Sequence, residues 1–280
     1  MPHAVLTVRH SWRSRVTMIR DILVTLLEDD VFSRNWMALL LVRDWRTRLI
    51  AEFTNQVELC QYINENSQPF DVLIMDVDLF GETFTVHEIC ENLNDRHLST
   101  KILLTGVQAD SRIFHQQHSE QVAGYVLKGE VGYSLSWVIS FAADGYFILT
   151  PGTMSLASRM NYSLPHDRMI LDGRRSIPGF TDHESEVARL AFIFSLGRRD
   201  LADELKISEQ WSYGLVSELY KKMGLGEILS GEVDLFSYIP ENPIIRKHFT
   251  TILEEMGTST KARDMETLAY HLLTMPEILT

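Results

Sequence analysis

The sequence predicts an α/β protein in which a doubly wound parallel sheet is followed by an all-helical second half. Three observations support this class. Between residues 22 and 149, short continuous apolar runs alternate with segments whose apolar residues recur at helical spacing. Acidic or polar side chains end several of the apolar runs. From residue 180 onward only the helical spacing continues.

The first half contains five predicted strands and five predicted helices in alternation. We expect strands at 22–27, 48–53, 71–75, 101–105 and 124–128. We expect helices at 32–44, 57–63, 84–93, 110–121 and 131–143. Continuous apolar strands are typical of a sheet that is buried on both faces. The alternation implies right-handed parallel crossovers, with any ligand bound at the carboxyl ends of the strands.

Two stretches outside this pattern have their own character. Residues 1–21 are predicted to form an N-terminal arm, since they carry four arginines and no acid before Asp21. A transit peptide, or a true start at Met18, are alternatives that the sequence leaves open. Residues 150–179 are predicted to be a linker, because Pro and Gly are frequent there and the periodicity is weak.

The composition is that of a globular protein. Hydrophobic residues make up 45% of the chain, and no apolar run approaches the roughly 18 residues that a membrane helix needs. Cys60 and Cys90 are too few for a disulfide framework or a zinc site, and a reducing cytoplasm is the expected location. The net charge is −12, and residues 22–149 carry 18 acidic and 8 basic side chains. Such a chain has no general attraction for nucleic acid.

Side chains suited to phosphate chemistry stand at the ends of the predicted strands. Glu28 and Asp29 follow the first strand, Asp76 follows the third, and Thr105 and Lys128 end the last two. In a parallel sheet these side chains converge on one edge. Three carboxylates suit a hard cation such as Mg²⁺, beside which Asp76 could attack a small phosphodonor. Lys128 would pair with the acyl phosphate, and Thr105 would contact it only after phosphorylation, which can drive a switch.

These residues resemble the ordered signature of a receiver domain from two-component response regulators. The matching motifs are Glu28-Asp29-Asp30, Asp71 to Asp78, Thr105-Gly106 and Gly124 to Lys128. The resemblance covers residues 22–149 and implies a flavodoxin-like sheet of five parallel strands. It also implies a sensor histidine kinase as phosphodonor and no enzyme activity beyond Mg²⁺-dependent self-phosphorylation and dephosphorylation.

The resemblance assigns a role to each site residue. It makes Asp76 the phosphoacceptor, and it gives the switch and the contact with the phosphoryl group to Thr105, Tyr125 and Lys128. Mg²⁺ would be bound by Glu28, Asp29, Asp76 and the backbone carbonyl of Asp78.

Three details depart from the receiver pattern. Phe80 stands where proline is usual, and Gly129 follows the lysine where Pro or Asp is frequent. Asp30 leaves open which two of the three consecutive acids form the metal-binding pair.

Residues 180–226 are similar to a LuxR-type helix-turn-helix. Thr181 and Glu184 have the spacing of a capping box, and Ser208 opens a second helix that Gly224 ends. The match carries about one extra residue near Ser195–Gly197. A receiver, a linker and this motif form the arrangement of the NarL/FixJ class of transcriptional regulators. In a helix-turn-helix the second helix reads the major groove of DNA.

The resemblance places DNA contacts on the second helix, at Gln210, Trp211, Tyr213, Lys221 and Lys222. Gln210 could read adenine, and the two lysines could hold phosphate. Tyr213 and Leu215 stand where the family often carries Lys and His. Segment 180–225 carries six basic and eight acidic side chains, opposite to the usual charge of a DNA-binding domain.

Two alternative functions therefore stay open. One is a regulator whose degenerate helix-turn-helix binds protein. The other is a phosphorylation-independent regulator that keeps the acids without using them.

Residues 227–280 are predicted to be a helical extension with amphipathic helices at 243–256 and 260–275. Their apolar stripes either pack onto the preceding domain or form a homodimer or partner surface. His248 and His271 lie beside these stripes and are expected to be packing or surface residues, not ligands.

Overall fold

The computed structural model describes residues 21–65, 68–79, 86–115, 120–174, 177, 179–256 and 262–279. Nearly all of the predicted N-terminal arm, and Phe80, lie outside these residues. The strands are β1 (Ile22–Leu27), β2 (Thr47–Phe53), β3 (Val72–Asp76), β4 (Lys101–Gly106), β5 (Val122–Leu127), β6 (Phe147–Leu149), β7 (Arg168–Asp172) and β8 (Glu277–Leu279).

The helices of the first half are α1 (Val31–Arg43), α2 (Gln56–Glu65), α3 (Val86–Asp95), α4 (Ser111–His115), α5 (Lys128–Val131), α6 (Leu135–Ala143) and α7 (Pro151–Arg159). The helices of the second half are α8 (Asp182–Ala188), α9 (Arg198–Leu205), α10 (Glu209–Lys222), α11 (Leu225–Ser230), α12 (Pro243–Met256) and α13 (Ala262–Thr274). Short 3₁₀ turns cover Val77–Leu79, Gly132–Ser134 and Leu235–Ser237, and a π-helical turn covers Arg189–Ile193.

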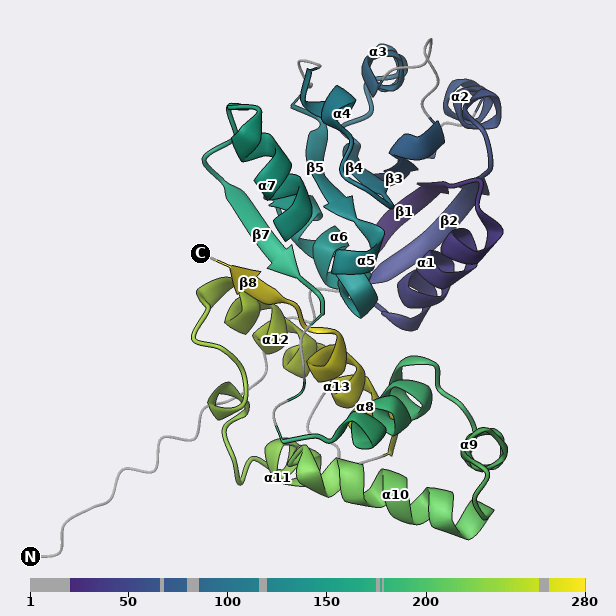
Figure 1. The fold of residues 1–280 in the computed structure, drawn as a ribbon, viewed down its shortest axis with the longest axis vertical. Helices are drawn as coiled ribbons and strands as arrows, with labels where there is room; N and C mark the ends of the chain where they lie inside the picture. Colours follow the sequence, from purple (N-terminus) through teal and green to yellow (C-terminus); the bar gives the residue numbers. More distant parts are fainter. Residues whose placement is uncertain are drawn as a thin grey trace, which may run out of the picture.

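A single sheet runs through the molecule in the strand order β2-β1-β3-β4-β5-β6-β7-β8 (Figure 1). Each neighbouring pair is parallel except β7 with β8, which is antiparallel. The order of the first five strands is that of flavodoxin-like doubly wound folds. The predicted α/β class is therefore confirmed, and the five predicted strands are present.

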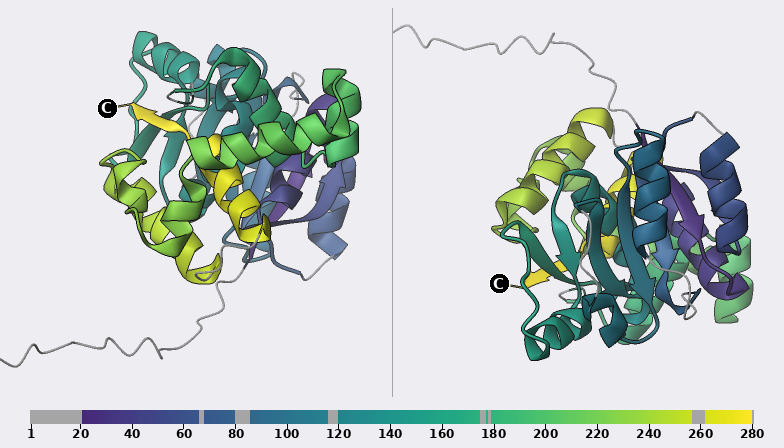
Figure 2. Two further views of the ribbon diagram at one scale, coloured as in Figure 1. Left: turned by 90° about the horizontal axis from the view of Figure 1, so that it is seen from below. Right: turned by 90° about the horizontal axis from the view of Figure 1, so that it is seen from above.

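Helices cover both faces of the sheet, which explains why its strands read as continuous apolar runs. Helices α1 and α6 share one core with the helices of the second half, whereas α2, α3, α4 and α7 share the core on the other face. The two further views in Figure 2 show these layers. Strand β3 is buried along its whole length, so its final residue, Asp76, is held in a fixed position.

The sheet has three more strands than the sequence predicted. Strands β6 and β7 extend it in parallel, and β8 returns from the C-terminal end of the chain to pair with β7 (Figure 1). Residues 150–174, which we expected to be part of a linker, instead contain α7 and β7. The linker prediction was wrong here because it treated Pro151 as a break in helical structure. A proline in the first turn of a helix removes no internal hydrogen bond and is compatible with α7.

The second half contains the predicted helix pair. Thr181 and Glu184 make both hydrogen bonds of a capping box at the start of α8. Lys206 adopts a left-handed conformation (φ 55°) in the turn between α9 and α10, and Ser208 caps α10. The π-helical turn after α8 lies just before the stretch where the sequence match carries an extra residue. A π turn is a common way for a helix to accommodate an inserted residue.

The C-terminal extension packs back onto the rest of the molecule. Leu268, Ala269 and Tyr270 of α13 are at most 1% exposed and belong to the core shared with α1 and α6. The helices predicted at 243–256 and 260–275 are thus present. We expected these helices either to pack onto the preceding domain or to form a homodimer or partner surface, and the structure shows the packing. No described helix is both long enough and apolar enough to cross a bilayer.

Candidate functional site

Three carboxylates meet at the carboxyl ends of β1 and β3, where the strand order reverses direction. Oxygen atoms of Glu28, Asp29 and Asp76 lie within 4.8 Å of one another. Glu28 and Asp76 are buried, whereas Asp29 is exposed at the mouth of the cluster. Ligands of doubly wound sheets bind at this switch point. The sequence prediction that these three residues converge is confirmed.

Lys128 provides the positive charge of this cluster. It is the first residue of α5, directly after β5, and its side chain is 10% exposed. Its Nζ lies 2.6 Å from Glu28 Oε2 and donates a hydrogen bond of 2.9 Å to Asp76 Oδ2. The ammonium group therefore bridges the two buried carboxylates.

Burial and charge act together on these groups. Burial raises the pKa of Glu28 above its usual value, against the hydrogen bond and charge of Lys128, which lower it. Burial alone would lower the pKa of Lys128, but the two carboxylates outweigh it and the pKa is raised. Lys128 thus stays protonated, and Glu28 is the carboxyl whose ionised form is disfavoured.

Asp30 is not part of the cluster, which answers the question that the three consecutive acids left open. Its carboxylate accepts a hydrogen bond of 2.7 Å from Ser33 N and caps α1. Ordinary N-capping explains this position. Arg34, which the sequence reading missed, donates to the backbone oxygens of Glu28 (2.9 Å) and Asp29 (3.3 Å) and so fixes the loop that presents both acids.

The two hydroxyl-bearing residues lie on neighbouring strands beside Asp76. The register of β3 with β4 pairs Asp76 with Thr105, whose Oγ1 lies 3.4 Å from the Met75 carbonyl oxygen to which it donates. Tyr125 is 1% exposed; its hydroxyl donates to Gln108 O and accepts from Asp110 N, both at 2.9 Å. Burial raises the pKa of Tyr125 to about 12. Thr105 therefore lies beside Asp76 at the end of β4, and Tyr125 joins β5 to the loop after β4.

The donor set suits a divalent cation with oxygen ligands. Three carboxylates and one ammonium carry a formal charge of −2, which a single Mg²⁺ would balance. Exposed Asp29 leaves one side open to water and phosphate oxygens. The residues Glu28, Asp29 and Asp76 would hold the ion, and it would supply charge stabilisation at an incoming phosphoryl group.

Asp78 lies in the 3₁₀ turn after β3. Its amide donates to Asp76 Oδ1 at 3.1 Å, and its own side chain is exposed. This hydrogen bond orients the Asp76 carboxylate. The expected metal contact through the Asp78 carbonyl oxygen stays a prediction.

The five predicted DNA contacts all lie on the exposed side of α10, which crosses the face seen from below in Figure 2. Trp211 and Tyr213 are 63% and 57% exposed. The two lysines already have partners: Lys221 Nζ lies 2.8 Å from Glu218 Oε1, and Lys222 Nζ lies 2.8 Å from Glu184 Oε2. The phosphate contacts predicted for them would compete with these pairs.

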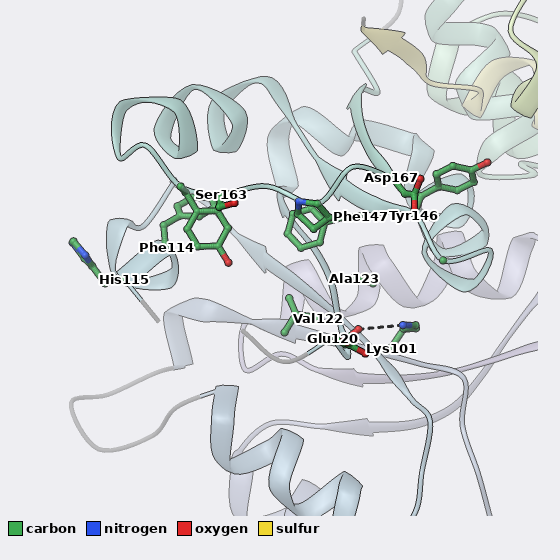
Figure 3. Close-up of a pocket in the computed structure, with 13 residues that line it drawn as sticks. Lys101, Phe114, His115, Glu120, Val122, Ala123, Tyr146, Phe147, Ser163 and Asp167 are labelled. Atoms are coloured by element: carbon green, nitrogen blue, oxygen red, sulfur yellow. Dashed lines mark hydrogen bonds between the residues drawn. The ribbon is translucent and has the colours of Figure 1, made fainter. Parts of the chain in front are cut away.

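A separate hollow of about 870 Å³ lies at the amino-terminal ends of β4, β5 and β6, the opposite ends from those that carry the carboxylate cluster. Its walls include Lys101, Val122 and Phe147, the first residues of β4, β5 and β6, together with Phe114 of α4 (Figure 3). Because the strands are parallel, their first residues lie at the edge away from the carboxylate cluster. None of the predicted site residues lines this hollow.

Sequence reasoning also missed a set of contacts on β5 and α5. Thr153 Oγ1 donates to Tyr125 O at 2.8 Å, and Leu127 N donates to Thr150 Oγ1 at 3.1 Å. Both threonines come from the start of α7, in the stretch expected to be a linker. The one local indication was Thr150 followed by Pro151, an N-cap residue before a proline in the first turn.

Comparisons with known proteins gave structural similarity only. No protein-family model matches the sequence, and no curated protein matches it. Solved structures with a similar fold include the response regulator ChrA of a heme-sensing two-component system, with 19% identity, a TM-score of 0.36 and coverage of 73% of this chain and 90% of that one.

Two RcsB structures are also similar. An RcsB–DNA complex has 16% identity and a TM-score of 0.43, with 71% of this chain and 90% of that one covered. Salmonella typhimurium RcsB has 15% identity and a TM-score of 0.41, with 84% and 100% covered.

Proposed function

We propose that this protein is a phosphorylation-dependent response regulator in which Asp76 accepts a phosphoryl group and thereby controls a C-terminal helix-turn-helix. The observation that carries the proposal is the cluster at the end of β1 and β3. It joins a buried nucleophilic carboxylate, Asp76, to a bridging ammonium group, Lys128, and to two further carboxylates.

Each residue of the cluster has a part in the proposed reaction. The Asp76 carboxylate attacks the phosphorus of a donor such as a phosphohistidine or acetyl phosphate, and the donor group leaves with its bonding electrons. Lys128, now 2.9 Å from Asp76 Oδ2, pairs with the new phosphoryl oxygens. Glu28, Asp29 and Asp76 would hold Mg²⁺, which would offset the repulsion between the phosphoryl group and the carboxylates.

The switch would work through Thr105 and Tyr125. Among the described residues, the Thr105 hydroxyl makes one long hydrogen bond, to Met75 O, so a shorter bond to a phosphoryl oxygen would be more favourable. A contact that exists in only one state shifts the equilibrium toward that state. Tyr125, bonded to both Gln108 and Asp110, would carry a movement of the loop after β4 to strand β5.

Phosphorylation itself is tested with acetyl phosphate and Mg²⁺. We expect intact-mass spectrometry to show the addition of one phosphoryl group, and we expect this addition to disappear in Asp76→Asn and on chelation of Mg²⁺. Asp95→Asn, at an exposed position at the end of α3, is the matched control and should be phosphorylated normally. A wild-type mass that never changes would refute the proposal. Equal output from wild type and Asp76→Asn would favour the phosphorylation-independent alternative.

The output that we propose is sequence-specific DNA binding by α10. Gln210, Trp211 and Tyr213 lie exposed near its start, where a recognition helix contacts base edges. Fluorescence anisotropy with genomic DNA pools, with and without beryllofluoride and Mg²⁺, measures this binding. Saturable binding that tightens with the phosphoryl mimic would support it.

A second candidate output is protein binding, and α10 itself gives the reason. Both of its lysines are paired with carboxylates, and its exposed Trp211 lines a hollow of about 480 Å³ together with Gly214 and Leu215. Lys221→Ala with Lys222→Ala should abolish DNA binding under the first candidate and matter little under the second. Trp211→Ala should weaken capture of a protein partner under the second, and Val57→Ala, at a similarly exposed apolar position on α2, is the control.

A further inference from the structure

The short helix that carries Lys128 has little structure of its own. Helix α5 is only four residues long, and its N-cap residue, Leu127, makes no side-chain capping hydrogen bond. The backbone amide of Leu127 instead donates a hydrogen bond of 3.1 Å to the hydroxyl group of Thr150, at the start of α7. The backbone position of Lys128 therefore depends on a residue that is more than twenty positions later in the chain.

Further hydrogen bonds hold both sides of this turn. Thr153 Oγ1 donates to Tyr125 O at 2.8 Å, and Gly152 N donates to Glu130 Oε2 at 2.8 Å. Gly173, after β7, donates from its amide to Glu130 O at 2.7 Å. Thr150 and Thr153 are fully buried, so water does not compete for their hydroxyl groups. We call Thr150, Gly152, Thr153 and Gly173 the clamp.

The glycines of the clamp allow the close approach that these bonds need. A Cβ at Gly152 would lie 2.6 Å from a Leu127 methyl group, and one at Gly173 would overlap the Val131 carbonyl oxygen. A larger residue at Gly173 would require a shift of the backbone, whereas one at Gly152 would displace the side chains of Leu127 and Glu130. The start of α7 and the residue after β7 therefore both pack closely against α5 and donate hydrogen bonds to its Glu130.

The clamp is continuous with the C-terminal end of the chain. Strand β7, which leads into Gly173, pairs with β8 through Leu171 and Ile278. Helix α13, just before β8, bonds to the first half through Tyr270 O–H to Leu40 O (3.1 Å) and Trp137 Nε1 to Thr274 Oγ1 (3.2 Å). We call residues 262–279 the strap. Figure 1 shows it in yellow, with β8 at the edge of the sheet.

We propose that Thr150 and Thr153 are positioning residues that hold Lys128 at Asp76, and that the clamp couples occupancy of the Asp76 site to the strap. The coupling rests on the proposed function, because it needs a phosphoryl group at Asp76. A phosphoryl group that draws Lys128 away from Glu28 moves the backbone of α5. That movement reaches β7 directly and β8 through its pairing with β7, since Glu130 is bonded to both ends of the α7–β7 unit.

The test uses the full-length chain and beryllofluoride with Mg²⁺. Fluorine NMR reports whether beryllofluoride binds, and hydrogen exchange measured by mass spectrometry reports on the strap. Thr153→Val removes the hydroxyl with little change of shape, and Thr153→Ser restores it. Thr100→Val is the matched control: it removes a buried hydroxyl that donates to Phe70 O at 2.7 Å, beside the start of β4.

In wild type, Thr153→Ser and Thr100→Val, we expect beryllofluoride to change the exchange of the strap. Thr153→Val loses the hydrogen bond to Tyr125 O and the one accepted from Thr150 N, so we expect at least about fivefold weaker binding and no change in the strap at saturation. A Thr153→Val variant that transmits the change as wild type does would overturn the inference. So would a wild-type strap that stays unchanged while beryllofluoride is bound.

The failure of the proposed function looks different. Absence of any bound fluorine resonance in wild type would refute phosphorylation at Asp76 and the coupling with it. Should Thr153→Val not fold, the Thr150→Val and Thr150→Ser pair makes the same comparison at the Leu127 amide.

Discussion

At the scale of single residues, the site depends on one buried cation between two buried carboxylates. Lys128, Glu28 and Asp76 are each at most 10% exposed. The ammonium group of Lys128 balances the negative charge of Glu28 and Asp76, and the two carboxylates stabilise the buried ammonium group. A buried pair is strongly destabilised when one partner is removed, even where its net contribution is small.

Lys128→Met should therefore destabilise the Mg²⁺-free protein by about 3–5 kcal/mol, because it leaves Glu28 and Asp76 side by side without a cation. Urea unfolding measures the loss. Mg²⁺ should then stabilise the variant more than it stabilises wild type, since the ion would replace the missing charge. Lys101→Met, at the other end of the sheet, is the control. An equal effect of Mg²⁺ on wild type and Lys128→Met would contradict the assigned metal site.

His271 is a second buried titratable group, on the strap. It lies 3.8 Å from Asp44, and neither ring nitrogen has a hydrogen-bond partner among the described residues. Burial lowers the pKa of His271 to about 3, against the attraction of Asp44. The folded protein thus holds the ring neutral, which agrees with the expected packing role.

The pH dependence follows from this shift. Below pH 6.5 the unfolded chain gains a proton at His271 and the folded chain does not until about pH 3, so the contribution to stability falls as the pH drops. The largest slope is about 1.4 kcal/mol per pH unit. Glu28, with its raised pKa, acts in the opposite sense over part of this range.

His271→Phe isolates the effect. At pH 7 we expect the variant to be as stable as wild type or more so, because it removes two unpaired buried nitrogens. Below pH 6.5 it should lose stability less steeply. Urea unfolding at several pH values measures the difference between the two proteins. Parallel pH profiles would show that His271 does not titrate on unfolding as assigned.

At the scale of elements, α10 contains a glycine that its helical structure does not need. Gly214 lies in the middle of the helix, and a Cβ built there meets nothing within 4 Å. Glycine at such a position costs helix stability relative to alanine. Gly214 instead lines the hollow beside Trp211, where the absence of a side chain leaves space.

Gly214→Ala should raise the free energy of unfolding by up to about 1 kcal/mol. The same substitution at Gly224, where φ is 63° and a Cβ would lie 2.7 Å from the Tyr238 hydroxyl, should lower it. Thermal unfolding compares the two variants. If Gly214→Ala also weakens binding to DNA or protein despite its greater stability, the hollow belongs to the output surface.

At the scale of the whole molecule, the two halves share one core. Buried residues from Val24 in β1 to Met275 after α13 form a single cluster that includes the helix-turn-helix. A response regulator with a flexible linker would have two separate cores. Here the strap and the strands β6 and β7 join the halves.

Leu268→Ala should therefore lower the stability of the whole chain by about 2–5 kcal/mol, because the side chain is fully buried in the shared core. Calorimetry should show one transition that shifts as a unit. The fluorescence of Trp137, which is bonded to Thr274, should report the same midpoint as circular dichroism. Two separated transitions would show that the halves unfold independently.

The sequence by itself determined the five strands of the first half and the residues of the site. Apolar runs buried on both faces reveal parallel strands, and a parallel sheet brings strand ends together, so Glu28, Asp29, Asp76, Thr105 and Lys128 could be grouped without a structure. Capping chemistry is local in the same way, and it correctly placed the starts of α8 and α10 at Thr181 and Ser208.

Tertiary structure alone decided the rest. Asp30 could be separated from Glu28 and Asp29 only once its carboxylate was seen to cap α1. Strands β6, β7 and β8 have three to five residues each and are stabilised by partners far away in the chain, so no local pattern distinguishes them from a linker. The clamp on α5 and the ion pairs of Lys221 and Lys222 likewise join residues whose proximity depends on the folded chain.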